Sequence, residues 1–112
     1  MKTNDFDKYQ KNVEKTAIYP GIGKNFIYPT IGLVGEAGEI ANKVKKVIRD
    51  DKSKIDKKNR EELAYELGDV MWYIAQLSTE LDLKLSKIIK MNIMKLAKRM
   101  KSNTLHGSGD HR

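Results

Sequence analysis

Four acidic residues, spaced as two pairs, are the part of this sequence best suited to chemistry. Glu36 and Glu39 are three residues apart, and so are Glu66 and Asp69, so each pair would share one face of a helix. Like charges at this spacing destabilise an isolated helix, and these acids lie among apolar and small residues, where ionised carboxylates are costly to desolvate. A hard divalent cation such as Mg²⁺, which takes oxygen ligands, would offset this cost. The pattern therefore predicts a carboxylate metal site between two helices.

The two acidic pairs belong to a repeated segment. Residues 33–47 align with residues 63–77 as L-x-x-E-x-G-[ED]-[IV]-x-x-x-[VI]-x-x-[VL]. In each copy the apolar positions form one stripe with the acids along its edge, so we expect two paired helices that present their acids to a shared space. Gly38 and Gly68 predict close approach of backbone or ligand, because glycine costs about 1 kcal/mol relative to alanine inside a helix. The alternative is that the acids are solvated and paired with nearby cations such as Lys43.

Length and composition limit the class of protein. A chain of 112 residues with 39% hydrophobic and 33% charged residues predicts one globular domain over residues 1–112. The absence of cysteine excludes disulfides, thiolate nucleophiles and cysteine-ligated zinc. No apolar run is long enough to span a membrane, and the first residues lack the apolar region of a signal peptide. We therefore expect a cytoplasmic protein with no membrane partner.

The hydrophobic periodicity predicts an all-α fold. No segment alternates with period two, and four segments repeat at helical spacing. Thr30 is the expected N-cap of the second helix, after a loop over residues 19–29 that contains both prolines. Residues 101–112 form a glycine-containing tail that would be either flexible or site-closing. The predicted helices cover about residues 5–16, 30–49, 59–81 and 85–100.

The net charge of +7 lies in the last quarter of the chain. Residues 84–112 contain eight basic residues and one acid, whereas the preceding residues contain 14 of each. Asn92 falls within the apolar stripe of the last helix, and Lys95 and Arg99 follow along the same edge. A buried asparagine needs partners, and two cations beside it would suit a triphosphate. The alternative for Asn92 is a hydrogen bond between helices. Four other lysines are expected on a solvated face: Lys87, Lys90, Lys98 and Lys101.

Several aromatic residues are candidates for contacts at the site. Tyr73 follows Asp69 by one helical turn, so it lies on the acid-bearing side and could bind phosphate or sugar, or cover the wall of the site. Trp72 lies on another face, where we expect a buried anchor or a subunit contact. Phe26 and Tyr28, in the proline-containing loop, could stack on a base.

The sequence resembles the MazG-like nucleoside triphosphate pyrophosphohydrolases, an all-α superfamily. GLVGEAGEIANKVKK followed by ELGDVMWYIAQL carries the family signature of Glu-x-x-Glu, a spacer and Glu-x-x-Asp, and NIMKLAKRM matches its N-x-x-K-L pattern. The resemblance implies a bundle of four to five helices that is completed by formation of a homodimer or homotetramer. It also implies Mg²⁺, with Mn²⁺ as a substitute, held by four carboxylates: Glu36, Glu39, Glu66 and Asp69.

The resemblance further implies an activity. Family members hydrolyse (deoxy)nucleoside triphosphates between the α and β phosphates and release a monophosphate and pyrophosphate, which would suit removal of non-canonical nucleotides. Glu36 or Glu39 is the expected acceptor of the proton from the attacking water. The expected substrate-binding residues are Tyr73, Asn92, Lys95 and Arg99.

Two other functions compete with this interpretation. A pI of about 9.5 and the basic last helix would suit a nucleic-acid-binding protein, and a helical interaction module would need the acids to be surface charges. However, the basic region lacks a helix-turn-helix signature, and a carboxylate cluster would repel phosphates unless a metal intervened. We therefore expect a single nucleotide, rather than a nucleic acid, as the anionic partner.

Overall fold

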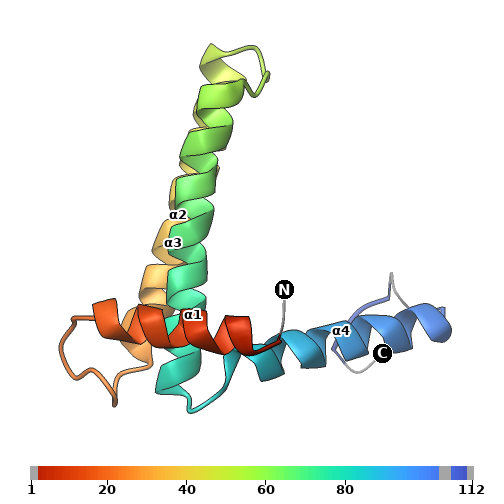
Figure 1. Ribbon diagram of the computed structural model, residues 1–112. Helices are drawn as coiled ribbons and strands as arrows, with labels where there is room; N and C mark the ends of the chain where they lie inside the picture. The colour runs from red at the N-terminus through yellow and green to blue at the C-terminus, as the bar shows by residue number, and fades with distance from the viewer. Residues whose placement is uncertain (1–2, 104–106, 111–112) are drawn as a thin grey trace.

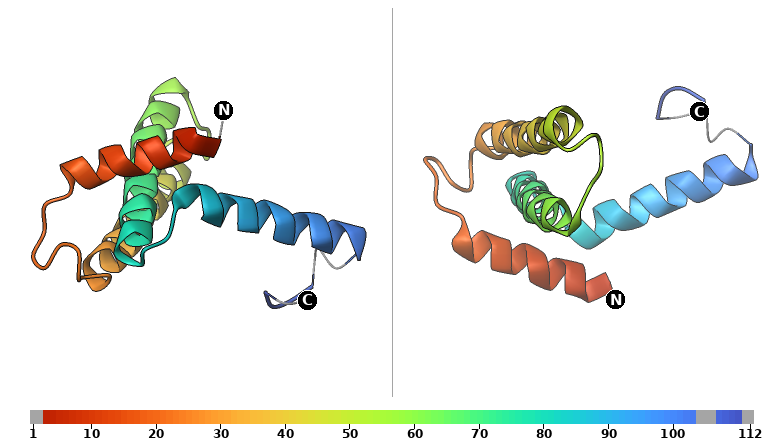
Figure 2. Two further views of the ribbon diagram at one scale, coloured as in Figure 1. Left: turned by 60° about the horizontal axis from the view of Figure 1, so that its bottom comes forward. Right: turned by 90° about the horizontal axis from the view of Figure 1, so that it is seen from above.

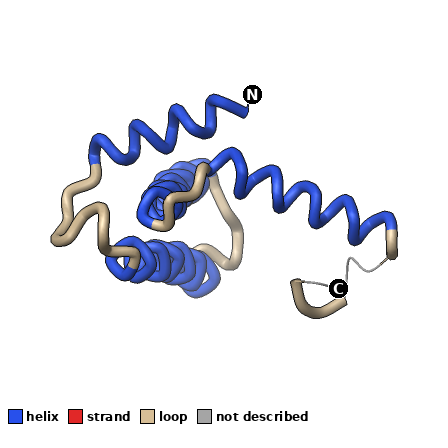
Figure 3. Tube along the Cα trace, turned by 90° about the horizontal axis from the view of Figure 1, so that it is seen from below, coloured by secondary structure: helices blue, strands red, loops and turns tan. Residues whose placement is uncertain are grey.

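The chain folds into four helices in the computed structural model, which describes residues 3–103 and 107–110. These are α1 (Thr3–Thr16), α2 (Ile27–Asp50), α3 (Lys57–Glu80) and α4 (Leu85–Lys101). Figure 3 shows helices joined by loops, with no strand in the described part of the chain. The prediction of an all-α fold is therefore confirmed. Within that part of the chain, no helix is long and apolar enough to cross a membrane.

Helices α2 and α3 form a long antiparallel pair, with α1 and α4 at its base (Figure 1). Seen along the pair, α2 and α3 lie side by side, α1 crosses beside α3, and α4 runs away from them (Figure 2). The two copies of the sequence repeat therefore pack against each other. This packing is what an apolar stripe at helical spacing on each segment favours.

Helix α2 begins at Ile27 rather than at the predicted Thr30. The side-chain oxygen of Asn25 accepts a hydrogen bond from the backbone N–H of Tyr28 at 3.0 Å, which satisfies a free donor of the first turn. Pro29 fits this turn because a residue there needs no N–H partner within the helix. The Thr30 hydroxyl donates to a carbonyl of the preceding turn at 2.7 Å, so the prediction that Thr30 caps the helix is wrong.

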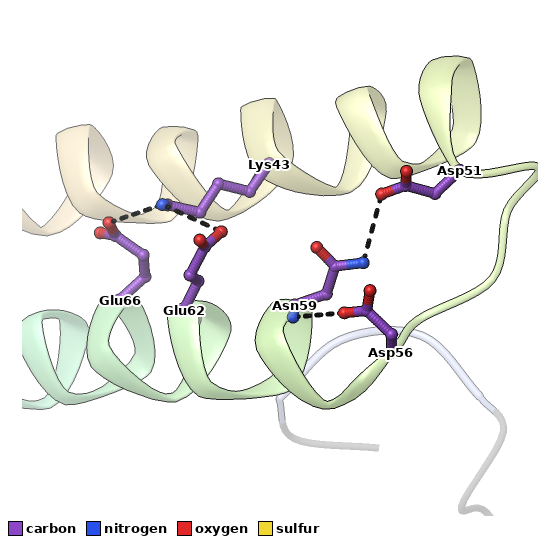
Figure 4. Close-up of polar contacts among 6 residues, drawn as sticks. All are labelled: Lys43, Asp51, Asp56, Asn59, Glu62 and Glu66. Carbon is purple, nitrogen blue, oxygen red and sulfur yellow. Dashed lines mark hydrogen bonds and ion pairs between the residues drawn. The ribbon is translucent and has the colours of Figure 1, made fainter.

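The connection between α2 and α3 is closed by a cap and a cross-link. The carboxylate of Asp56 accepts from the backbone N–H of Asn59 at 2.8 Å and so caps α3. The Asn59 side chain donates in turn to Asp51, just beyond the end of α2, at 3.3 Å (Figure 4). These contacts hold the far end of the helix pair together.

A small core joins the base of the helix pair to α1 and α4. The Trp72 indole N–H donates to the Thr16 hydroxyl at 2.9 Å, so this side chain ties α3 to α1, although it is half-buried and not the buried anchor that was predicted. The core consists of Val13, Ala75 and Leu85, with Phe6, Tyr9, Trp72 and Ile89 packed against it.

Helix α1 supplies the polar contacts that fix the start of α4. The carboxylate of Asp7 accepts from the backbone N–H and the hydroxyl of Ser86, at 3.1 and 2.8 Å. These hydrogen bonds lower the pKa of Asp7. The Gln10 side chain accepts from the N–H of Leu85 and donates to the carbonyl of Leu83, both at 2.8 Å. Because the cap comes from another helix, the direction of α4 is set by α1.

The loop before α2 is clamped to the end of α3 by one carboxylate. Glu80 accepts hydrogen bonds from the Tyr19 hydroxyl and from the backbone N–H groups of Gly23 and Asn25. Gln76 donates to the same Tyr19 oxygen at 2.8 Å. Burial and the bond to Glu80 raise the pKa of Tyr19 to about 12. Burial also acts to raise the pKa of Glu80, but its three hydrogen bonds outweigh this and lower it.

We expect Glu80→Ala to lower the free energy of unfolding by about 1–2 kcal/mol, because it leaves the Tyr19 hydroxyl and two backbone donors without an acceptor. Since the pKa of Glu80 is lowered in the folded protein, its contribution is complete above the ordinary carboxyl pKa. The contribution is lost as the pH falls through the lowered value. Urea unfolding at neutral and acidic pH measures this. Exposed Glu14→Ala is the control, and equal losses in both variants would contradict the clamp.

Candidate functional site

Three of the four predicted carboxylates come together between α2 and α3. Glu36 from α2 and Glu66 and Asp69 from α3 each place a carboxylate oxygen within 4.8 Å of the other two. Glu36 and Glu66 are half-buried, whereas Asp69 is exposed. We call this set the acid trio. Glu39, the fourth predicted ligand, is exposed and lies outside the trio.

The electrostatics of the acid trio favour a bound positive charge. Burial raises the pKa of Glu36, and the charges of Asp69, Glu66 and Glu39 raise it further. Glu39 therefore acts on Glu36 although it is not part of the trio. Oxygen donors that repel one another when ionised fit a hard divalent cation, which would remove that repulsion. The residues present thus suit the metal that their sequence pattern predicts.

Lys43 supplies part of the missing positive charge from α2. Its ammonium nitrogen lies 3.7 Å from a carboxylate oxygen of Glu66 and 3.9 Å from one of Glu62 (Figure 4). Lys43 therefore makes the kind of ion pair that the sequence left open for these acids. In the part of the chain that the structure describes, neither Glu36 nor Asp69 has an ion pair of this kind, so the negative charge concentrates on their side of the trio.

Tyr73 lies at the edge of the trio, as its position one turn after Asp69 predicted. Burial raises the pKa of this tyrosine, and the nearby Tyr28 and the charges of Glu36 and Asp69 add to the effect. Its ring covers Gly32 of α2, where a β-carbon would stand only 2.1 Å from the ring. Gly32, four residues before Glu36, was not singled out by sequence reasoning. Because Gly32 and Glu36 are four residues apart, they lie on the same face of the helix, and this spacing could have identified Gly32 as part of the site.

The glycines of the repeat do not permit close packing within the chain. A β-carbon added to Gly38 or Gly68 would meet no described atom within 4 Å. The prediction that they allow close backbone approach is therefore wrong for the single chain. Instead, Gly68 and Asp69 line an open hollow of about 460 Å³ with Glu61, Ala64 and Tyr65. The acid trio thus has open space on the α3 side, where a ligand could enter.

The predicted phosphate-binding residues of α4 form a second cluster. Asn92, Lys95 and Arg99 line an open hollow of about 730 Å³ together with Lys87 and Lys98. The prediction that four lysines of α4 share a separate solvated face is therefore wrong for Lys87 and Lys98, which line this hollow. Asn92 is exposed rather than buried in an apolar stripe, because much of that stripe is itself uncovered.

One chain does not bring this cationic cluster to the acid trio. Helix α4 runs away from the α2–α3 pair beyond its first turns (Figure 1). Lys95 and Arg99 instead contact the tail, through Gly109 and Asp110. The predicted tail covers residues 101–112, of which residues 104–106 and 111–112 lie outside the described residues.

The loop aromatics are only partly available for a base. Tyr28 stacks on Tyr19 with ring centroids 4.6 Å apart, so one face of its ring is covered. Phe26 is 55% exposed at the start of α2. A stacking role for either residue stays a prediction.

Comparison with known proteins agrees with this geometry. Residues 30–104 match the MazG nucleotide pyrophosphohydrolase domain, a segment that contains the acid trio and the whole of α4. A curated relative, "Gene 37 protein" of Mycobacterium phage L5, is 51% identical over 111 residues, covering 95% of this chain and 97% of the relative. No solved structure matches the chain. Since the family match spans well over half of its 112 residues, the chain belongs to the MazG nucleotide pyrophosphohydrolase domain family.

Proposed function

We propose that this protein hydrolyses (deoxy)nucleoside triphosphates between the α and β phosphates, with Mg²⁺ as its metal and Mn²⁺ as a substitute. The observation that carries the proposal is the acid trio, in which carboxylates from two packed helices lie within 4.8 Å of one another in a chain of the MazG family. Among the described residues, Lys43 is the one cation that forms an ion pair with this set. A metal-bound triphosphate would complete it. Removal of non-canonical or excess nucleotides is the use that we infer.

We assign metal binding and proton acceptance to the carboxylate side chains of the site. Glu36, Glu66 and Asp69, joined by Glu39, would hold the metal, which when bound would supply positive charge against the phosphate oxygens and acidify a water molecule. Glu36 or Glu39 would accept the proton of the attacking water.

We infer that the phosphates are bound by α4 of a second copy. Asn92, Lys95 and Arg99 carry the right donors, yet α4 of the same chain runs away from the trio. Large apolar side chains are uncovered on α2, α3 and α4, more than a single chain of this size would normally expose. A homodimer or homotetramer would cover them and could bring α4 to the trio of its partner. The exposed side chains include Ile31, Val34, Tyr65, Met71, Ile93 and Met94.

Turnover of a panel of nucleotides tests the proposed function. We expect purified protein with Mg²⁺ to convert at least one NTP or dNTP to its monophosphate and pyrophosphate in equal amounts, and to stop when EDTA is added. Products are measured by anion-exchange chromatography. Release of orthophosphate instead of pyrophosphate would contradict cleavage between the α and β phosphates. Salt-dependent DNA binding without turnover would favour the nucleic-acid alternative.

A further inference from the structure

The short segment 107–110 lies against the last two turns of α4. One carboxylate oxygen of Asp110 is 3.2 Å from the Lys95 ammonium and 3.7 Å from a terminal guanidinium nitrogen of Arg99. The same Arg99 nitrogen donates to the carbonyl of Gly109 at 3.0 Å. Asp110 therefore contacts both of the cations that we assign to phosphate binding, and Gly109 contacts one of them.

Arg99 is an unusual cation because its side chain is only 7% exposed. Its Nε is buried and has no hydrogen-bond partner among the described residues. A buried guanidinium donor without an acceptor is costly, and an anion is the acceptor that guanidinium binds best. The residue also lines the hollow of α4. Arg99 is thus only partly satisfied by the described part of the tail, and it lies where an anion in the hollow could complete its contacts.

Lys95 and Arg99 repel each other unless an anion lies between them. They are four residues apart on one helix face, where like charges destabilise the helix and favour rotamers that point apart. Asp110 contacts both, so its carboxylate can hold the two side chains side by side. Gly109 has a φ of +83°, a conformation that glycine adopts without strain and that sets the direction of the carbonyl accepting from Arg99.

We propose that Asp110 is a positioning residue that aligns Lys95 and Arg99 to bind the phosphates of the substrate. This inference rests on the proposed function and extends it to a residue beyond the family match, which ends at residue 104. Lysine has three donors and arginine five, so each can keep its contact with the tail and still donate to a phosphate oxygen. Asp110 itself does not touch the substrate.

The opposite role, a tail that competes with phosphate for the same cations, fits the contacts less well. A competitor should use the donors that the ligand needs. Lys95 does donate to the Asp110 carboxylate, but the Arg99 nitrogen that reaches the tail donates to a neutral carbonyl, and its Nε has no acceptor among the described residues. The Asp110 side chain is 79% exposed, so it borders the hollow rather than filling it.

Asp110→Asn tests the proposal in the full-length protein. We expect KM for the best nucleotide to rise about five- to tenfold, with kcat within about twofold, because the metal site is untouched. Asp110→Glu should restore most of the affinity. Asp82→Asn, which removes one exposed acid from the turn before α4, is the matched control and should leave KM unchanged. Circular dichroism and thermal unfolding verify that each variant is folded.

Two further measurements separate positioning from other roles. In a Lys95→Ala background, Asp110→Asn should add much less than its effect in the wild type, because it acts through the cations. Calorimetric binding of inorganic tripolyphosphate with Mg²⁺ should weaken in Asp110→Asn. An unchanged KM would overturn the proposal, and a lowered KM would show that the tail competes with phosphate. If the wild type hydrolyses no nucleotide, the proposed function fails, whereas the tripolyphosphate measurement still decides the role of Asp110.

Discussion

Glu36→Gln should lower nucleotide turnover by about a hundredfold or more, because it removes a charged oxygen ligand from the centre of the acid trio. Glu36 is the only member of the trio that comes from α2, so without it the remaining two members both come from α3. It is also one of the two candidate proton acceptors. Steady-state rates with saturating Mg²⁺ measure the effect. Glu39→Gln tests whether the exposed fourth acid joins the trio when metal binds, and an unchanged rate would restrict the site to three carboxylates.

The same substitution should not destabilise the metal-free protein. The pKa of Glu36 is raised in the folded state, so the protonated carboxyl is favoured there. Its stabilising contribution is complete below the ordinary carboxyl pKa and is lost as the pH rises through the raised value. At neutral pH in EDTA we therefore expect Glu36→Gln to unfold at the same temperature as the wild type, or higher. Mg²⁺ should raise the melting temperature of the wild type more than that of the variant.

Retained turnover in Glu36→Gln would contradict the assigned site, and so would an equal loss in Glu14→Gln, which removes an exposed carboxylate from α1. A lowered melting temperature in EDTA would show that Glu36 has a structural role. Activity and stability therefore change in opposite directions only if the carboxylates repel one another in the absence of metal.

Much of the fold could be predicted from local patterns. Helix positions follow from apolar spacing, and the repeat in residues 33–47 and 63–77 correctly indicated that α2 and α3 pack as a pair. The start of α2 was missed because the Asn25 side chain, and not Thr30, accepts from the first turn, and because Pro29 was assigned to a loop. The direction of α4 was beyond prediction, since Asp7 and Gln10 fix it through contacts across almost the whole chain.

The candidate site also has a part that could be predicted from local patterns and a part that could not. The acids could be found because helical spacing places them on one face, and the meeting of Glu36 with Asp69 follows from the helix pair. The contact between Asp110 and Arg99 could not be predicted from the sequence, because the tail has no hydrophobic periodicity that would indicate which helix it packs against. The prediction of a buried Asn92 was wrong because a stripe of apolar residues does not say whether its own chain covers it.

The uncovered stripe of α4 leads to the second large effect. Mixing Glu36→Gln protein with Lys95→Glu protein should restore activity that neither variant has alone. The first variant lacks an intact acid trio, and the second reverses a charge needed by the triphosphate. If α4 of one copy serves the trio of its partner, each mixed dimer contains one wild-type site and one doubly altered site. Random exchange in equal amounts would then give about a quarter of wild-type activity.

A mixture of Glu36→Gln with Asp69→Asn is the matched control. Both substitutions alter the acid trio, whose members come from one chain, so no exchange of subunits can rebuild an intact site. Co-expression with two affinity tags isolates the mixed species, and its rate is compared with those of the parents. Recovery in the first pair but not in the second requires a site shared between copies. Failure of the first pair to recover, in verified mixed oligomers, would place α4 and the acid trio in separate functions.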